Sequence, residues 1–115
     1  MLHGEFSRRS TPTHIFTLPE ELTMKDIVDV SIAYRQKNNT VLIKHLEDCH
    51  FFPQLDPERT VAVVLSQEET LLFNPNIKVV EVQFVVATTG SDVIPISKYR
   101  FRLNDSYDTE VFDLS

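Results

Sequence analysis

The chain has 115 residues, of which 42% are hydrophobic and 24% charged, so it is long enough for one domain with a buried core and too short for two. This composition excludes intrinsic disorder, the single cysteine excludes a disulfide framework, and no apolar run reaches the roughly 20 residues of a membrane-spanning helix. Eleven basic against seventeen acidic residues give a formal charge of −6, which disfavours binding to nucleic acid and to anionic membranes.

The first third of the chain predicts an arm followed by strands. Residues 1–12 show no periodicity and end at Pro12, so we expect an N-terminal arm there. A short strand is predicted from His14 to Leu18, where Pro19 ends it. Alternation from Ile27 to Arg35 predicts a strand with one buried and one wet face. The residues expected on its buried face are Val28, Val30, Ile32 and Tyr34.

The middle of the chain predicts a hairpin, a further strand and one helical turn. Asn38-Asn39 suits a tight turn before a strand at residues 40–43. A short strand at residues 49–52 and a longer one at residues 60–65 are expected next. Ser66 and Glu69 have the spacing of a capping box, which predicts a short helical turn at residues 67–72.

Two long strands are predicted near the end. Residues 77–88 alternate most clearly, and residues 93–103 form the return strand after a turn in which Gly90 supplies the conformational freedom. The inward parity changes within the return strand, which predicts a bulge at Ser97-Lys98 with Pro95 at an edge or beside the irregularity.

About seven short strands without a long helical pattern predict an all-β fold, a single antiparallel immunoglobulin-like sandwich. The domain is expected to span residues 13–103, with an acidic C-terminal tail at residues 104–115. Phe16, Phe84 and Phe101 take inward positions of three strands, where rings fill the space between two sheets.

The residues give little support for catalysis. His45, Cys49 and His50 form one cluster of possible zinc ligands, but His45 and Cys49 share a face only on a helix, and a free thiol beside exposed histidines is the preferred interpretation. With two glycines, the chain lacks the phosphate-binding loops and nucleophile elbow that glycines build. We therefore expect no catalytic residues, no cofactor, no metal and no enzymatic activity.

Two groups of residues are the candidate interface. Phe6, Arg8 and Arg9 lie in the expected arm, where a phenylalanine is useful only if it docks on its own domain or on a neighbour. The second group, Lys98, Arg100 and Arg102, lines one face of the return strand. Such a stripe forms either a small anion-binding patch or, more commonly, the wet face of an amphipathic strand.

Several segments together resemble an uncharacterised family of small β-sandwich proteins encoded in phages and prophages of gut Firmicutes. The most specific are the segment from Thr11 to Leu18, with its Thr-Pro-Thr-His start, and the segment from Ser66 to Phe73. The likeness covers about residues 8–103 and departs at residues 97–103 and in the tail. It implies a virion or assembly protein with no active site to carry over.

The expected function is that of a non-enzymatic phage structural protein of the head or tail, acting through protein–protein contacts. Its expected partners are other copies and other phage structural proteins, and its expected location is the virion, after the host cytoplasm. Deleting residues 1–12 is expected to leave the domain folded and to block assembly. The alternatives are an acidic phage-encoded inhibitor that binds a basic host protein, and a surface- or carbohydrate-binding module, which the lack of tryptophan disfavours.

Overall fold

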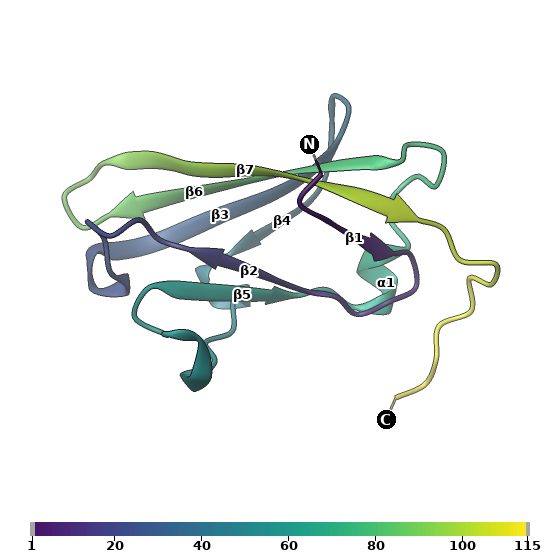
Figure 1. Ribbon diagram of the computed structural model, residues 1–115, viewed down its shortest axis with the longest axis horizontal. Helices are drawn as coiled ribbons and strands as arrows, with labels where there is room; N and C mark the ends of the chain where they lie inside the picture. Colours follow the sequence, from purple (N-terminus) through teal and green to yellow (C-terminus); the bar gives the residue numbers. More distant parts are fainter. Residues whose placement is uncertain (1, 115) are drawn as a thin grey trace.

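The computed structural model describes residues 2–114, which form a sandwich of a five-stranded and a two-stranded sheet (Figure 1). The five-stranded sheet has the order β1-β7-β6-β3-β4, and the two-stranded sheet pairs β2 with β5. This arrangement confirms the predicted all-β sandwich with seven strands and one short helical turn. The strands are β1 (Gly4–Ser7), β2 (Thr13–Thr17), β3 (Ile27–Gln36), β4 (Asn39–His45), β5 (Thr60–Val64), β6 (Val79–Thr88) and β7 (Val93–Asn104).

The connections contain short helical segments only. They are the 3-10 turns at Met24–Asp26, Leu46–Asp48 and Pro53–Leu55, and the helix α1 (Gln67–Thr70). No helix among residues 2–114 has the length and apolar character needed to cross a membrane.

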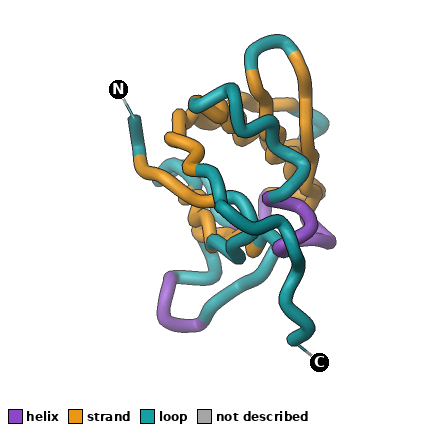
Figure 2. The backbone as a smooth tube through the Cα atoms, turned by 90° about the vertical axis from the view of Figure 1, so that its right-hand side faces the viewer, coloured by secondary structure: helices purple, strands orange, loops and turns teal. Residues whose placement is uncertain are grey.

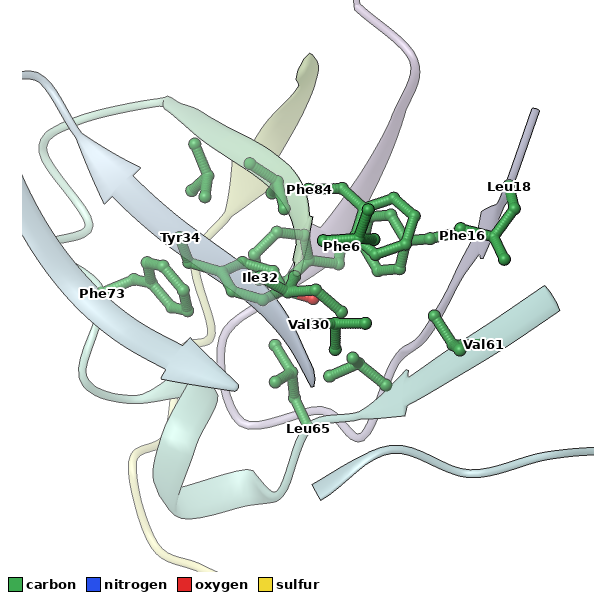
Figure 3. Packing of buried hydrophobic residues seen from close by; sticks show 14 of the residues in the cluster. Phe6, Phe16, Leu18, Val30, Ile32, Tyr34, Val61, Leu65, Phe73 and Phe84 are labelled. Carbon is green, nitrogen blue, oxygen red and sulfur yellow. The ribbon is translucent and has the colours of Figure 1, made fainter. Parts of the chain in front are cut away.

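The core lies between the two sheets, whose strands are seen nearly end-on in Figure 2. It confirms the alternation predicted for β6, whose inward side chains are at most 1% exposed, whereas β5 is buried on both faces. Rings from several strands meet in this core, among them Phe16 and Phe84, whose centroids are 5.4 Å apart (Figure 3). The inward residues of β5 and β6, with Leu65 directly after β5, are Val61, Val63, Leu65, Val80, Val82, Phe84 and Val86.

Irregular pairing shifts three predicted details. Val28 is 57% exposed because the register of β3 with β6 slips between Ile27 and Asp29, so that Ile27 is buried in its place. In β7, Ile96 is the residue that interrupts the pairing with β6, one position before the predicted bulge, and Pro95 lies directly beside it. The predicted strand at residues 49–52 is reduced to a single bridge between His50 and Ala62.

The turns place positive φ on other residues than expected. The hairpin between β3 and β4 turns at Lys37, with φ of 54°, and Asn39 already pairs with Gln36. In the β6–β7 turn Ser91, with φ of 67°, takes the left-handed conformation that was assigned to Gly90.

The N-terminal segment is part of the domain, which corrects the expected arm. Gly4–Ser7 is strand β1, and it pairs in parallel with residues 101–104 of β7. Phe6 is 5% exposed, and its ring packs edge-on against Phe73 at 5.5 Å and His14 at 5.2 Å. The domain therefore begins several residues before Thr13.

His14 is a buried polar residue within this aromatic cluster. Its ring stacks on Phe101 with centroids 4.7 Å apart, and its Nδ1 lies 2.7 Å from the Tyr34 hydroxyl. Burial lowers the pKa of His14 from 6.5 to about 4 and raises the pKa of Tyr34 above its ordinary range. His14 is therefore neutral near pH 7, and its Nδ1 shares one hydrogen bond with the Tyr34 hydroxyl.

The predicted capping box is present at the start of α1. The Glu69 N–H donates to the Ser66 hydroxyl at 3.1 Å, and the Ser66 N–H donates to the Glu69 carboxylate at 2.9 Å. Lys44 of β4 forms an ion pair with the same carboxylate. Burial alone would raise the pKa of Glu69, but the hydrogen bonds from Lys44 and Ser66 outweigh it and lower the pKa. These contacts fix the helical turn against the end of the sandwich.

Candidate interaction site

The basic stripe, which consists of Lys98, Arg100 and Arg102, lies exposed on the outer face of β7. The neighbouring strand β6 places Gln83 opposite Lys98 and Glu81 opposite Arg100. The alternate residues of β7 turn inward, and Leu103 is 1% exposed. The three charged side chains are thus exposed on the outer face of the five-stranded sheet, and within residues 2–114 no other layer covers that face (Figure 1).

The structure separates the other predicted interface residues from this stripe. Phe6 is in the core, so its prediction as a surface contact is wrong: the arm docks on its own domain. Arg8 and Arg9 form the turn after β1, at the end of the sandwich where α1 lies. There they meet the C-terminal tail, residues 105–114, which leaves β7 and runs past α1 (Figure 1).

Arg8 connects the start of the tail to α1. Its Nη1 donates to Asp105 Oδ1 at 2.7 Å, and its Nη2 donates to the Leu71 carbonyl at 3.2 Å. The Arg8 side chain is 13% exposed, and its hydrogen bond lowers the pKa of Asp105. Asp105 directly follows the last residue of β7, so Arg8 holds the beginning of the tail next to the end of α1.

Arg9 makes two kinds of contact with the tail. Its Nη1 lies 3.6 Å from Asp108 Oδ2, and its guanidinium carbon lies 4.3 Å from the centroid of the Phe112 ring. A guanidinium over an aromatic face is attracted by the negative π-surface. Arg9 holds a left-handed backbone with φ of 65°, a conformation that non-glycine residues adopt at a cost.

Gln67 binds the backbone of the tail. Its Nε2 donates to the Phe112 carbonyl at 3.2 Å, and its Oε1 accepts from the Phe112 N–H at 2.9 Å. The Gln67 side chain thus makes the same pair of hydrogen bonds to the tail backbone that a residue of a neighbouring strand would make. Gln67 itself is 6% exposed. We call Arg8, Arg9 and Gln67 together the tail site.

The sequence indicated only part of the tail site. Arg8, Arg9 and the acidic tail were singled out by charge, yet their mutual pairing joins residues 97 positions apart and leaves no local pattern. Gln67 was missed because its position after Ser66 was read only as the first residue of a helical turn.

His45, Cys49 and His50 do not converge on one point. His45 Nδ1 donates to the Val30 carbonyl at 3.0 Å and is 3.5 Å from Asp29, whereas the His50 ring stacks against Phe52. Between residues 2 and 114 no group of three or more His, Cys, Asp or Glu side chains is arranged to hold a metal ion.

Cys49 is expected to be a slow nucleophile. Its thiol is half-buried and donates to the His45 carbonyl at 3.4 Å, and burial raises its pKa from 9.0 to about 11. Because the thiolate is the reactive form, alkylation at pH 8 should be slower than in the urea-unfolded chain by roughly tenfold or more. Alkylation rates measured by mass spectrometry from pH 7 to 11 test this, and equal rates in both states would contradict it.

Comparison with known proteins gives a fold-level likeness alone. No protein-family model matches the chain, and no curated protein matches it. Among solved structures it is similar to the crystal structure of CopC from Methylosinus trichosporium OB3b, at 12% identity and a TM-score of 0.44. That likeness covers 90% of this chain and 87% of the other. The resemblance of the sequence to phage-encoded proteins stays a prediction.

Proposed function

We propose that the protein is a non-enzymatic structural protein of a phage particle, present in many copies and acting through contacts between its copies and with other structural proteins. The observation that carries the proposal is the basic stripe of Lys98, Arg100 and Arg102, exposed on the uncovered face of the five-stranded sheet. One strand places these three residues on the same face at a regular spacing, so a partner with matching charges can pair with all of them at once.

We propose that a neighbouring copy of the chain binds this face. The chain has seventeen acidic residues against eleven basic ones, three of which form the stripe, so acidic residues outnumber basic ones on the rest of the chain. Six exposed acidic residues lie in the connections between β2 and β3 and between β4 and β5, and the second of these connections projects beyond β5 (Figure 1). They are Glu20, Glu21, Glu47, Asp48, Asp56 and Glu58. A stripe-to-loop contact is head-to-tail and repeats from copy to copy, as in a ring or tube.

Mass spectrometry of purified particles tests the proposal. The protein should be present in many copies per particle, and its absence from particles would overturn the structural role in favour of the inhibitor. Arg100→Ala should lower its incorporation into particles, because the central charge of the stripe is lost. Lys25→Ala, which removes an exposed basic side chain from a 3-10 turn elsewhere, should not.

A further inference from the structure

The tail lies against its own domain without joining either sheet. Residues 105–114 are bound by the side chains of the tail site, Arg8, Arg9 and Gln67, through hydrogen bonds, ion pairs and one ring contact. Only the Arg8–Asp105 pair lies at the strand end, so the chain can swing away beyond Asp105 while that pair stays in place. The exchangeable part is therefore residues 106–114, bound by Arg9 and Gln67.

The contacts at Arg9 and Gln67 are those of a peptide-binding site. Gln67 recognises the backbone of the peptide, as a neighbouring strand would, and Arg9 recognises one carboxylate and one aromatic ring. A hydrogen bond within the domain fixes the backbone next to the two binding residues. The buried Thr70 hydroxyl of α1 donates to the carbonyl of Ser10, the residue after Arg9, at 3.0 Å. A site that is fixed before binding takes its ligand at a lower entropy cost.

The bound tail leaves its own apolar side chains in solvent. Phe112 is 62% exposed although Arg9 covers one face of its ring, and Leu114 is 76% exposed. Tyr107 is fully exposed, and Val111 is 40% exposed. A segment with four such side chains in eight residues gains from packing on a second surface that its own domain does not provide.

We propose that the tail site is a binding site for an acidic, phenylalanine-bearing peptide, and that its partner in the assembled state is the 106–114 segment of a second copy of this chain. The same ion pair, ring contact and amide pairing form whether the segment comes from its own chain or from a neighbour, so exchange of the segment conserves them. The side chains that are exposed in the closed form supply additional contacts between the two copies. The inference rests on the proposed function, because it names the partner that a multi-copy protein would use.

Two full-length variants test the exchange by complementation. The first, Arg9→Ala/Gln67→Ala, keeps the tail and loses the site, and the second, Asp108→Ala/Phe112→Ala, keeps the site and loses the tail. In sedimentation velocity each variant alone should associate much more weakly than the wild-type chain, because the tail contact is lost and only the basic stripe remains. An equimolar mixture should form a one-to-one complex, because one intact site then meets one intact tail.

Controls separate tail exchange from other contacts. Lys25→Ala should leave self-association unchanged, whereas Phe112→Ala alone should weaken it by roughly tenfold or more, since an aromatic side chain anchors the segment. Phe112 is largely exposed, so loss of folding does not account for that effect. A mixture that forms no complex, or an unchanged chain that stays monomeric at all concentrations, would overturn the inference.

Failure of the inference and failure of the proposed function have different signatures. Association that survives Asp108→Ala/Phe112→Ala but is lost in Arg100→Ala would remove the tail exchange and leave the basic stripe as the contact. Complementation in the test tube together with absence from purified particles would leave the tail exchange standing and remove the phage structural role.

Discussion

Replacing Phe6 by alanine is expected to lower the free energy of unfolding by about 3–5 kcal/mol, the range seen when a buried ring is truncated. The ring is 5% exposed and touches rings on the neighbouring elements, with Phe73 at 5.5 Å and Phe101 at 6.2 Å. Its removal leaves a cavity under β1 that four residues of strand cannot close by shifting. Such a loss is a large share of the roughly 5–15 kcal/mol that holds a domain folded.

Urea titration followed by circular dichroism measures this effect. Leu2→Ala is the matched control within the same segment, because Leu2 is 47% exposed and its truncation should change stability by less than about 0.5 kcal/mol. A loss below about 1 kcal/mol in Phe6→Ala would show that the N-terminal segment is not part of the core. By the same argument, deletion of residues 1–12 should abolish cooperative folding, contrary to what the sequence suggested.

The strands that the sequence predicted best are those that are buried on one face over their full length. β6 alternates over ten residues, and each inward position between Val80 and Val86 is filled by a large apolar side chain. The period alone therefore determined which face lies in the core. The capping box at Ser66 was equally predictable from the sequence, because both of its hydrogen bonds join residues three positions apart.

The N-terminal strand was not predictable in this way. Gly4–Ser7 is too short to show a period, and only Phe6 among its four residues is buried. What makes it a strand is parallel pairing with residues 101–104, at the other end of the chain. A contact of this kind has no local signature, although the presence of a phenylalanine in an otherwise polar segment indicated that the segment docks somewhere.

The turns show the same limit on a smaller scale. Asn and Gly tolerate positive φ better than other residues, but the strand register decides which position must adopt it. In the first hairpin Gln36 pairs with Asn39, which leaves Lys37 at the strained position. The tail site depends in the same way on register and chain reversal, since Arg8 reaches Asp105 only because β1 pairs beside the end of β7.

Acidification from pH 6.5 to 4 is expected to destabilise the protein through His14, by up to about 3 kcal/mol. Burial lowers the pKa of His14 from 6.5 to about 4, so across this range the unfolded chain binds a proton that the folded domain does not. Stability therefore rises with pH between about 4 and 6.5 and then levels off. Asp29 and Glu69 are carboxylates with a lowered pKa in the folded protein. The stability that they contribute is lost as the pH falls through their ordinary pKa values of 3.8 and 4.5, near and below the acid end of this range.

Urea midpoints recorded at half-unit steps from pH 4.5 to 7.5 isolate the contribution of His14. His14→Phe keeps a ring for stacking on Phe101 and cannot titrate, so its stability should be nearly flat over this window, whatever its value at pH 7. His50→Gln removes an exposed histidine, and its stability should depend on pH in the same way as that of the wild-type protein. Where the phenylalanine variant proves too unstable, His14→Asn offers the Tyr34 hydroxyl an acceptor and removes the same titration. A slope that persists in both His14 variants would assign the acid sensitivity to another group, and would mean that the aromatic cluster around His14 admits its protonated form.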